Sequence, residues 1–170
     1  IDDEVCQEAS RQEIIRRYYD SLKRLADGMG NDQEVFKLEL LMKQAKVSVS
    51  DRPVVTAAMD REKVDGMPCA ALELTDGRMI TGGTSDLLGA ASALLLNALK
   101  SLAGIDHQVK VISPESISPI QYLKTAYLGS TNPRLHTDEV LIALSASAAQ
   151  NPLARQTLEQ LPKLSGCQAH

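Results

Sequence analysis

The sequence of 170 residues is 44% hydrophobic, 24% charged and only 3% aromatic, and its formal net charge is -4. This composition excludes a largely disordered or fibrous chain, and the length fits one domain with a core built mainly from aliphatic side chains. The acidic balance argues against nucleic acid as a partner, and the longest apolar run, residues 87–96, is far shorter than the roughly 20 residues of a membrane-spanning helix.

Two amphipathic helices are predicted at the start of the chain. Apolar residues recur at three- and four-residue steps from residue 2 to about residue 27, which is typical of a helix with one buried face. Gly28 ends this helix, and Asn31 with Glu34 has the spacing of a capping box that opens a second helix. We expect the two helices to form a hairpin.

The next segments predict a third helix and a β-hairpin. Pro53 suits the first turn of a helix, although residues 53–56 could also begin a strand. Residues 69–74 and 78–81 are extended runs on either side of an Asp-Gly turn, a combination that predicts a β-hairpin.

A helix with almost no polar face is predicted after the hairpin. The glycine-rich residues 82–85 lead directly into residues 86–103, where leucine and alanine predominate and Lys100 is the single basic residue. Such a helix belongs inside the domain. Residues 109–112, Val-Lys-Val-Ile, then predict a short strand.

Three more helices are predicted before the end of the chain. Ser113 has the position of a cap for the first of them, although Pro119 must shift its start. A loop of turn-forming residues, 128–135, precedes a second apolar helix over residues 140–149. An amphipathic helix over residues 152–161 follows.

These elements predict an α/β fold: a helix-rich single domain with a small mixed sheet, made of the β-hairpin and the strand 109–112, packed on the two apolar helices. Within it, residues 1–47 form the helical hairpin and residues 48–170 the α/β core. Because the sequence begins with Ile1 and has no leader, we interpret it as the C-terminal portion of a longer chain.

Three widely spaced cysteines, Cys6, Cys69 and Cys167, do not have the pattern of a secreted disulfide framework, so a cytoplasmic location is predicted. Cys69 is expected to be a small apolar residue of a core strand. Cys167 and His170 supply at most half of a zinc site. No metal site is therefore predicted, and no cofactor is identified.

Several stretches resemble a known family: RQEIIRRYY at residues 11–19, GSTNPRLH at 129–136 and EVLIAL at 139–144, together with the hairpin and residues 96–100. They resemble the C-terminal domain of the bacterial family called domain of unknown function 1846. The resemblance implies a cytoplasmic protein of roughly three times this length, as is usual for multi-domain chains. It also implies an N-terminal domain with a glycine-rich, phosphate-loop-like segment that these residues lack, and it implies no particular activity.

The first candidate site is the glycine turn Gly82, Gly83, Thr84 and Ser85. A strand end, two glycines and a helix start would place free backbone N–H groups and a positive dipole end at one point, where an anion can bind. The two hydroxyl groups could add donors, but no lysine follows and the pattern is not a Walker loop. An ordinary tight turn with a helix cap explains the same residues.

The second candidate site is the loop with Asn132, Arg134 and His136. Arg134 could hold a carboxylate or phosphate, and His136 is the one plausible proton carrier. Alternatively, Arg134 pairs with Asp138 or Glu139 and the loop is fixed by its own side chains.

Two functions of different classes follow. In the first, the two candidate segments converge on a site for a small anionic ligand, completed by the missing N-terminal domain of the same chain. In the second, the domain is a structural module that forms a homo-oligomer through the long first helix and its Tyr18-Tyr19 pair. Whether the protein is an enzyme stays open at this point.

Overall fold

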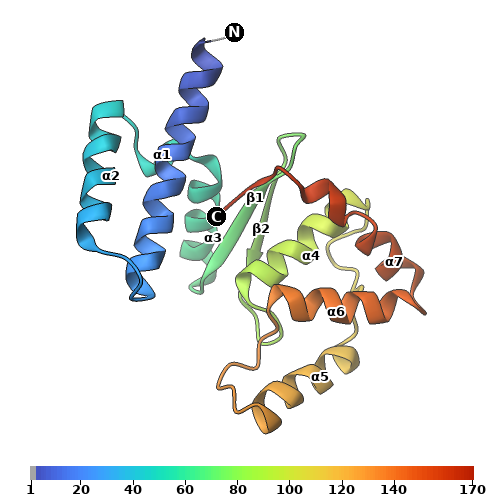
Figure 1. The fold of residues 1–170 in the computed structure, drawn as a ribbon. Coiled ribbons are helices and arrows are strands. Elements are labelled where there is room, and N and C mark those ends of the chain that lie inside the picture. The colour runs from blue at the N-terminus through green and yellow to red at the C-terminus, as the bar shows by residue number, and fades with distance from the viewer. Residues whose placement is uncertain (1–2) are drawn as a thin grey trace. The chain divides into compact units, whose positions relative to one another are not determined.

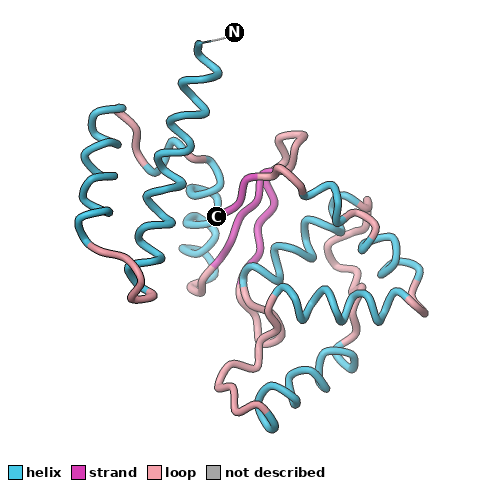
Figure 2. Tube along the Cα trace, in the orientation of Figure 1, coloured by secondary structure: helices cyan, strands magenta, loops and turns pink. Residues whose placement is uncertain are grey.

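The computed structural model describes residues 3–170, and its contacts divide the chain into two compact units (Figures 1 and 2). Unit 1 is Ile1–Thr56 and unit 2 is Ala57–His170. Among residues 3–170, no helix is both long and apolar enough to cross a bilayer.

Unit 1 contains the predicted helical hairpin. Helix α1 covers Asp3–Ala26 and α2 covers Asp32–Ala45. The turn between them is closed by the N–H groups of Met29 and Gly30, which both donate to the Arg24 carbonyl. Asn31 caps α2, because its side chain accepts the Glu34 N–H at 2.9 Å. The capping box therefore located this helix start correctly.

The core of unit 1 is small and lies between the two helices. Ile15 of α1, Met42 of α2 and Val47 after α2 are buried together, and Tyr18 and Tyr19 pack against them. A 3-10 turn, Val49–Asp51, leads to helix α3, Pro53–Asp65, so the helical interpretation of residues 53–56 is confirmed.

Unit 2 contains a three-stranded sheet in the order β2-β1-β3. Strands β1 (Cys69–Glu73) and β2 (Met79–Gly83) form the predicted hairpin, and β3 (Gln168–Ala169) pairs with the other edge of β1. The predicted helix-rich α/β fold with a small sheet is thus confirmed, but both strand pairings of this sheet are antiparallel, so the sheet is not mixed.

The predicted strand 109–112 was also wrong, because this segment is irregular. Its backbone carbonyls bind side chains instead of a neighbouring strand: Lys100 donates to Val109 and Asn151 donates to Val111. Val111 and Ile112 are buried in the helical core, so their apolar character reflects burial without β-structure.

Helix α4, Ala90–Leu102, packs directly on the sheet. Leu94 and Ala98 of this helix meet Ala70 and Leu72 of β1 in one apolar cluster. A Cβ added at Gly82 of β2 would lie only 2.1 Å from the backbone nitrogen of Leu94. Gly82 is therefore required by the close approach of helix and strand.

The remaining helices are α5 (Pro114–Tyr122), α6 (Thr137–Ala148) and α7 (Pro152–Leu158), with a π-helical turn, Leu123–Tyr127, directly after α5. Of these helices, α6 and α7 pack on α4, and α5 packs on α6. A second apolar cluster joins Leu99 of α4 to Val140 and Leu144 of α6. Pro119 does not shift the start of α5, because it lies inside that helix.

Candidate functional site

The glycines of the first candidate site belong to β2 and not to a helix start. Gly82 pairs with Ala70 and Gly83 with Cys69 in the sheet. A Cβ at Gly83 would lie 2.6 Å from Oδ2 of Asp65, so a carboxylate borders the position where we predicted an anion. Helix α4 begins only at Ala90, with Gly89 as its cap. The predicted start at residue 86 was therefore wrong.

The donors of Thr84 and Ser85 already have partners within the protein. Both the N–H and the hydroxyl of Thr84 donate to the Pro68 carbonyl, at 3.1 and 2.7 Å. The Ser85 N–H donates to the Leu88 carbonyl, and Oγ of Ser85 accepts the Leu87 and Leu88 N–H groups. These contacts form the turn that delays the start of α4 by four residues.

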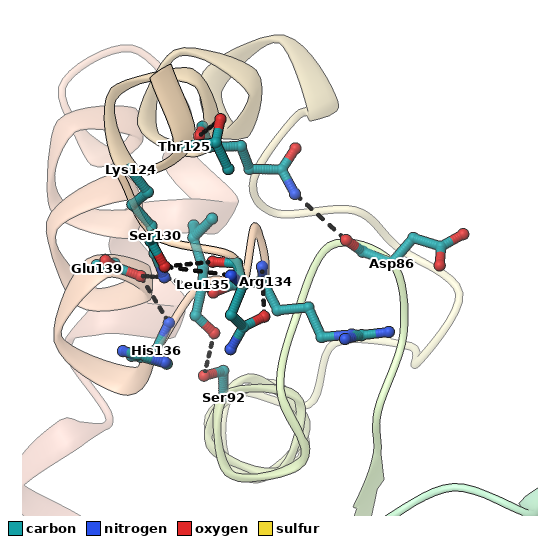
Figure 3. Close-up of polar contacts among 11 residues, drawn as sticks. Asp86, Ser92, Lys124, Thr125, Ser130, Arg134, Leu135, His136 and Glu139 are labelled. Carbon is teal, nitrogen blue, oxygen red and sulfur yellow. Dashed lines mark hydrogen bonds and ion pairs between the residues drawn. The ribbon is translucent and has the colours of Figure 1, made fainter. Parts of the chain in front are cut away.

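The structure joins the two predicted segments. Nε of Arg134 donates to the Ser85 carbonyl at 2.7 Å, and the Leu135 N–H donates to the Leu87 carbonyl at 2.9 Å. From α4, the buried Ser92 hydroxyl donates to the Leu135 carbonyl at 2.7 Å (Figure 3). These bonds hold the two loops directly against each other.

Glu139 pairs with Lys124 and not with Arg134. Lys124, only 6% exposed, donates to Glu139 at 2.8 Å and to the Arg134 carbonyl at 2.6 Å (Figure 3). Burial alone would raise the pKa of Glu139, but hydrogen bonds from Lys124 and from the His136 N–H together lower it. The His136 side chain is exposed, and Oδ1 of Asn132 accepts the Arg134 N–H.

A cavity of about 870 Å³ lies within unit 2. Its walls are the end of α3, strand β2 with the loop after it, one face of α4, the segment between α4 and α5, and the start of α5. Of the predicted residues, Gly83, Thr84 and Ser85 line this cavity, whereas Gly82, Asn132, Arg134 and His136 do not.

Lys100 is the most unusual residue of the cavity wall. It is 8% exposed, and its ammonium group donates to the carbonyls of His107 at 2.6 Å and Val109 at 3.3 Å. Within residues 3–170 it has no carboxylate in ion-pair contact. Burial lowers the pKa of Lys100, and the charge of Asp106 offsets only part of this effect.

The rest of the charged lining is mostly basic. Arg61 and Lys110 also line the cavity, together with His107, and the one acid in the lining is Asp65. Asp65 is already bound by Arg61, whose Nε lies 2.7 Å from Oδ2. The lining therefore has three basic side chains, Arg61, Lys100 and Lys110, and one carboxylate, which Arg61 already pairs, although the chain as a whole carries a formal charge of -4.

Family models match nearly the whole chain. Residues 50–170 match the model described as domain of unknown function DUF1846, C-terminal, and residues 1–46 match the model for the N-terminal region of the same family. The chain belongs to the DUF1846 family. The first two helices thus match the family's N-terminal region, whereas the sequence motifs indicated its C-terminal domain.

DUF1846 relatives extend well beyond these residues. The UPF0371 protein of Corynebacterium glutamicum (strain R) is 54% identical over 173 residues, which cover 100% of this chain and 34% of the relative. The UPF0371 protein of Streptococcus thermophilus (strain ATCC BAA-491 / LMD-9) is 46% identical over 169 residues, covering 99% and 34%. The chain thus spans about a third of the length of these curated relatives.

Proposed function

We propose that unit 2 binds a small anionic ligand, bearing a phosphate or carboxylate group, in the cavity around Lys100. The observation that carries this proposal is a buried ammonium group on the cavity wall with only backbone carbonyls as partners. A buried charge is costly unless it is paired, and an ammonium group has three donors, of which two are used here.

The second buried lysine of unit 2 shows what a purely structural lysine looks like in this fold. Lys124 also donates to a backbone carbonyl, but the Glu139 carboxylate balances its charge. Lys124 does not line the cavity. Lys100 differs on both counts, which supports a ligand as the source of the missing negative charge.

Arg61 and Lys110 extend the same proposal. Both line the cavity, and together with Lys100 they would favour an anion over a neutral or cationic molecule of the same size. The cavity volume falls in the range of ordinary small-molecule sites. In this proposal Lys100, Arg61 and Lys110 contact the ligand, in place of Gly82, Asn132, Arg134 and His136, which do not line the cavity.

The test is a thermal-shift titration of the chain with inorganic phosphate, pyrophosphate, ATP and citrate. A ligand that binds only the folded state raises the melting temperature. We expect at least one probe to raise it by a few degrees, and we expect added salt to weaken the effect because the attraction is electrostatic.

Variants of the cavity lining test whether the rise in melting temperature comes from binding in the cavity. Lys110→Gln and Arg61→Gln are preferred over changes at Lys100, because Lys100 also ties the segment after α4 through two carbonyls. Both variants should reduce the shift, whereas Lys37→Gln, an exposed lysine on α2, should leave it unchanged. No shift with any probe, or equal shifts in all three variants, would contradict the proposal.

The self-association proposal has less support. Tyr18 and Tyr19 are half-buried, stack edge to face with ring centres 5.6 Å apart and pack on the core of unit 1. They therefore do not form the exposed aromatic edge on which this idea was based. The cytoplasmic location is retained as a proposal, supported by three cysteines that are all free.

A further inference from the structure

Helix α2 is apolar on two separate faces. Met42 is buried in the core of unit 1, whereas Phe36 and Leu40 are 58% and 41% exposed. At 100° per residue, Phe36 and Leu40 lie about 120° and about 160° from Met42 around the helix axis. The pair therefore points away from the core of unit 1 and lies outside its apolar cluster.

A surface helix normally has one apolar stripe and one polar face. In α2 the exposed side carries the one phenylalanine of the whole chain, and Met29, in the turn before α2, is 68% exposed. A helix with apolar residues on opposite faces is typical of an element packed between two neighbours. Within unit 1, α1 packs on one of these two faces, and the Phe36–Leu40 face is exposed.

The comparisons indicate which segment covers this face. Residues 1–46 match the model for the N-terminal DUF1846 region, and the match to the C-terminal model begins at residue 50. The curated relatives are about three times as long as this chain. In those relatives α1 and α2 are thus the last part of a larger N-terminal region.

We infer that the Phe36–Leu40 face of α2 docks onto the part of the N-terminal DUF1846 region that precedes these two helices in the longer family proteins. In this contact, Phe36 and Leu40 form one side of an apolar core, and the preceding region supplies the other side. It is an attachment within one polypeptide, and it is independent of the anion cavity in unit 2.

The test compares the 170-residue chain with a long chain in which these residues replace the matching third of the Corynebacterium glutamicum relative. Hydrogen exchange of residues 32–45 should be more than about tenfold slower in the long chain, because docking suppresses local opening. The variant Phe36→Asp/Leu40→Asp should lower the melting temperature of the long chain by about 5 °C or more. In the 170-residue chain the same variant should change it by less than about 2 °C.

The control is Ile142→Asp on α6, where the side chain is 66% exposed. It should have equal effects in both chains, and Phe36→Ala gives a milder variant if the double variant of the long chain does not fold. Equal exchange of residues 32–45 in the two chains would overturn the inference. It would also be overturned if the 170-residue chain were a dimer by light scattering that Phe36→Asp/Leu40→Asp dissociates, since a second copy would then occupy this face.

Discussion

Single residues show most clearly what this sequence can and cannot reveal. Gly82 and Gly83 suggest a flexible anion-binding turn, but their actual roles depend on neighbours that are distant in sequence. Gly82 makes room for the backbone of Leu94, and Gly83 lies beside Asp65. A glycine required by close packing looks the same in a sequence as one required by a turn, so only the path of α4 separates the two roles.

Gly82→Ala should therefore destabilise the fold strongly. The new Cβ would lie 2.1 Å from the Leu94 nitrogen, and α4 must move away from the sheet to accept it. We expect a loss of about 3 kcal/mol in the free energy of unfolding, measured in urea. The matched change Gly89→Ala, where the nearest atom is 3.8 Å away, should cost about 1 kcal/mol or less. Equal losses in the two variants would refute the packing role.

Lys100 is the residue that sequence reasoning passed over. Its signal is present in the sequence, because it is the single basic residue of an otherwise apolar helix. The apolar composition of this helix places residue 100 inside the domain, and a buried lysine needs partners for its ammonium group. What the sequence does not give is the identity of those partners, since two backbone carbonyls outside the helix carry no recognisable pattern.

Among the elements, those with local signals were predicted well. The capping box at Asn31, the Asp-Gly hairpin and the helix starts at Pro53 and Pro152 all depend on neighbours in sequence. The two-residue strand β3 was missed, because it forms only by pairing with the distant edge of β1. Residues 109–112 were misassigned because apolar periodicity reports burial and not hydrogen bonding.

The Lys124–Glu139 pair joins two elements, the π-helical turn after α5 and the first turn of α6. Glu139→Gln should lower the free energy of unfolding at pH 7 by about 3 kcal/mol, because it leaves a buried ammonium group without its counter-charge. The exposed neighbour Asp138→Asn should cost less than about 1 kcal/mol.

The pH dependence of this loss follows from the lowered pKa of Glu139. A carboxyl group whose folded-state pKa is depressed contributes stability above its ordinary pKa of 4.5, and that stability disappears as the pH falls through the folded-state value. Urea unfolding of the wild type and Glu139→Gln should thus differ most near neutral pH and converge in acid. A difference that stays constant from pH 7 to pH 3 would argue against the ion pair as its source.

At the scale of the whole molecule, the sequence motifs identified the family but not the place of the site. The cavity is assembled from residues between Arg61 and Ile117 that belong to α3, β2, α4, α5 and the loops between them. No local pattern links these positions, so the sequence could not show which of the 18 lysine and arginine side chains face one hollow. The predicted division into residues 1–47 and 48–170 remains a proposal; the two compact units of the structure divide between Thr56 and Ala57.

The most direct test of the anion proposal is an NMR titration of the Lys100 side chain, assigned with Lys100→Gln, in the absence and presence of inorganic phosphate. In the free chain, burial should hold the pKa of Lys100 below its ordinary value of 10.5. A bound anion favours the charged form, so phosphate should raise the midpoint by about one pH unit or more. A midpoint that phosphate leaves unchanged would contradict the account.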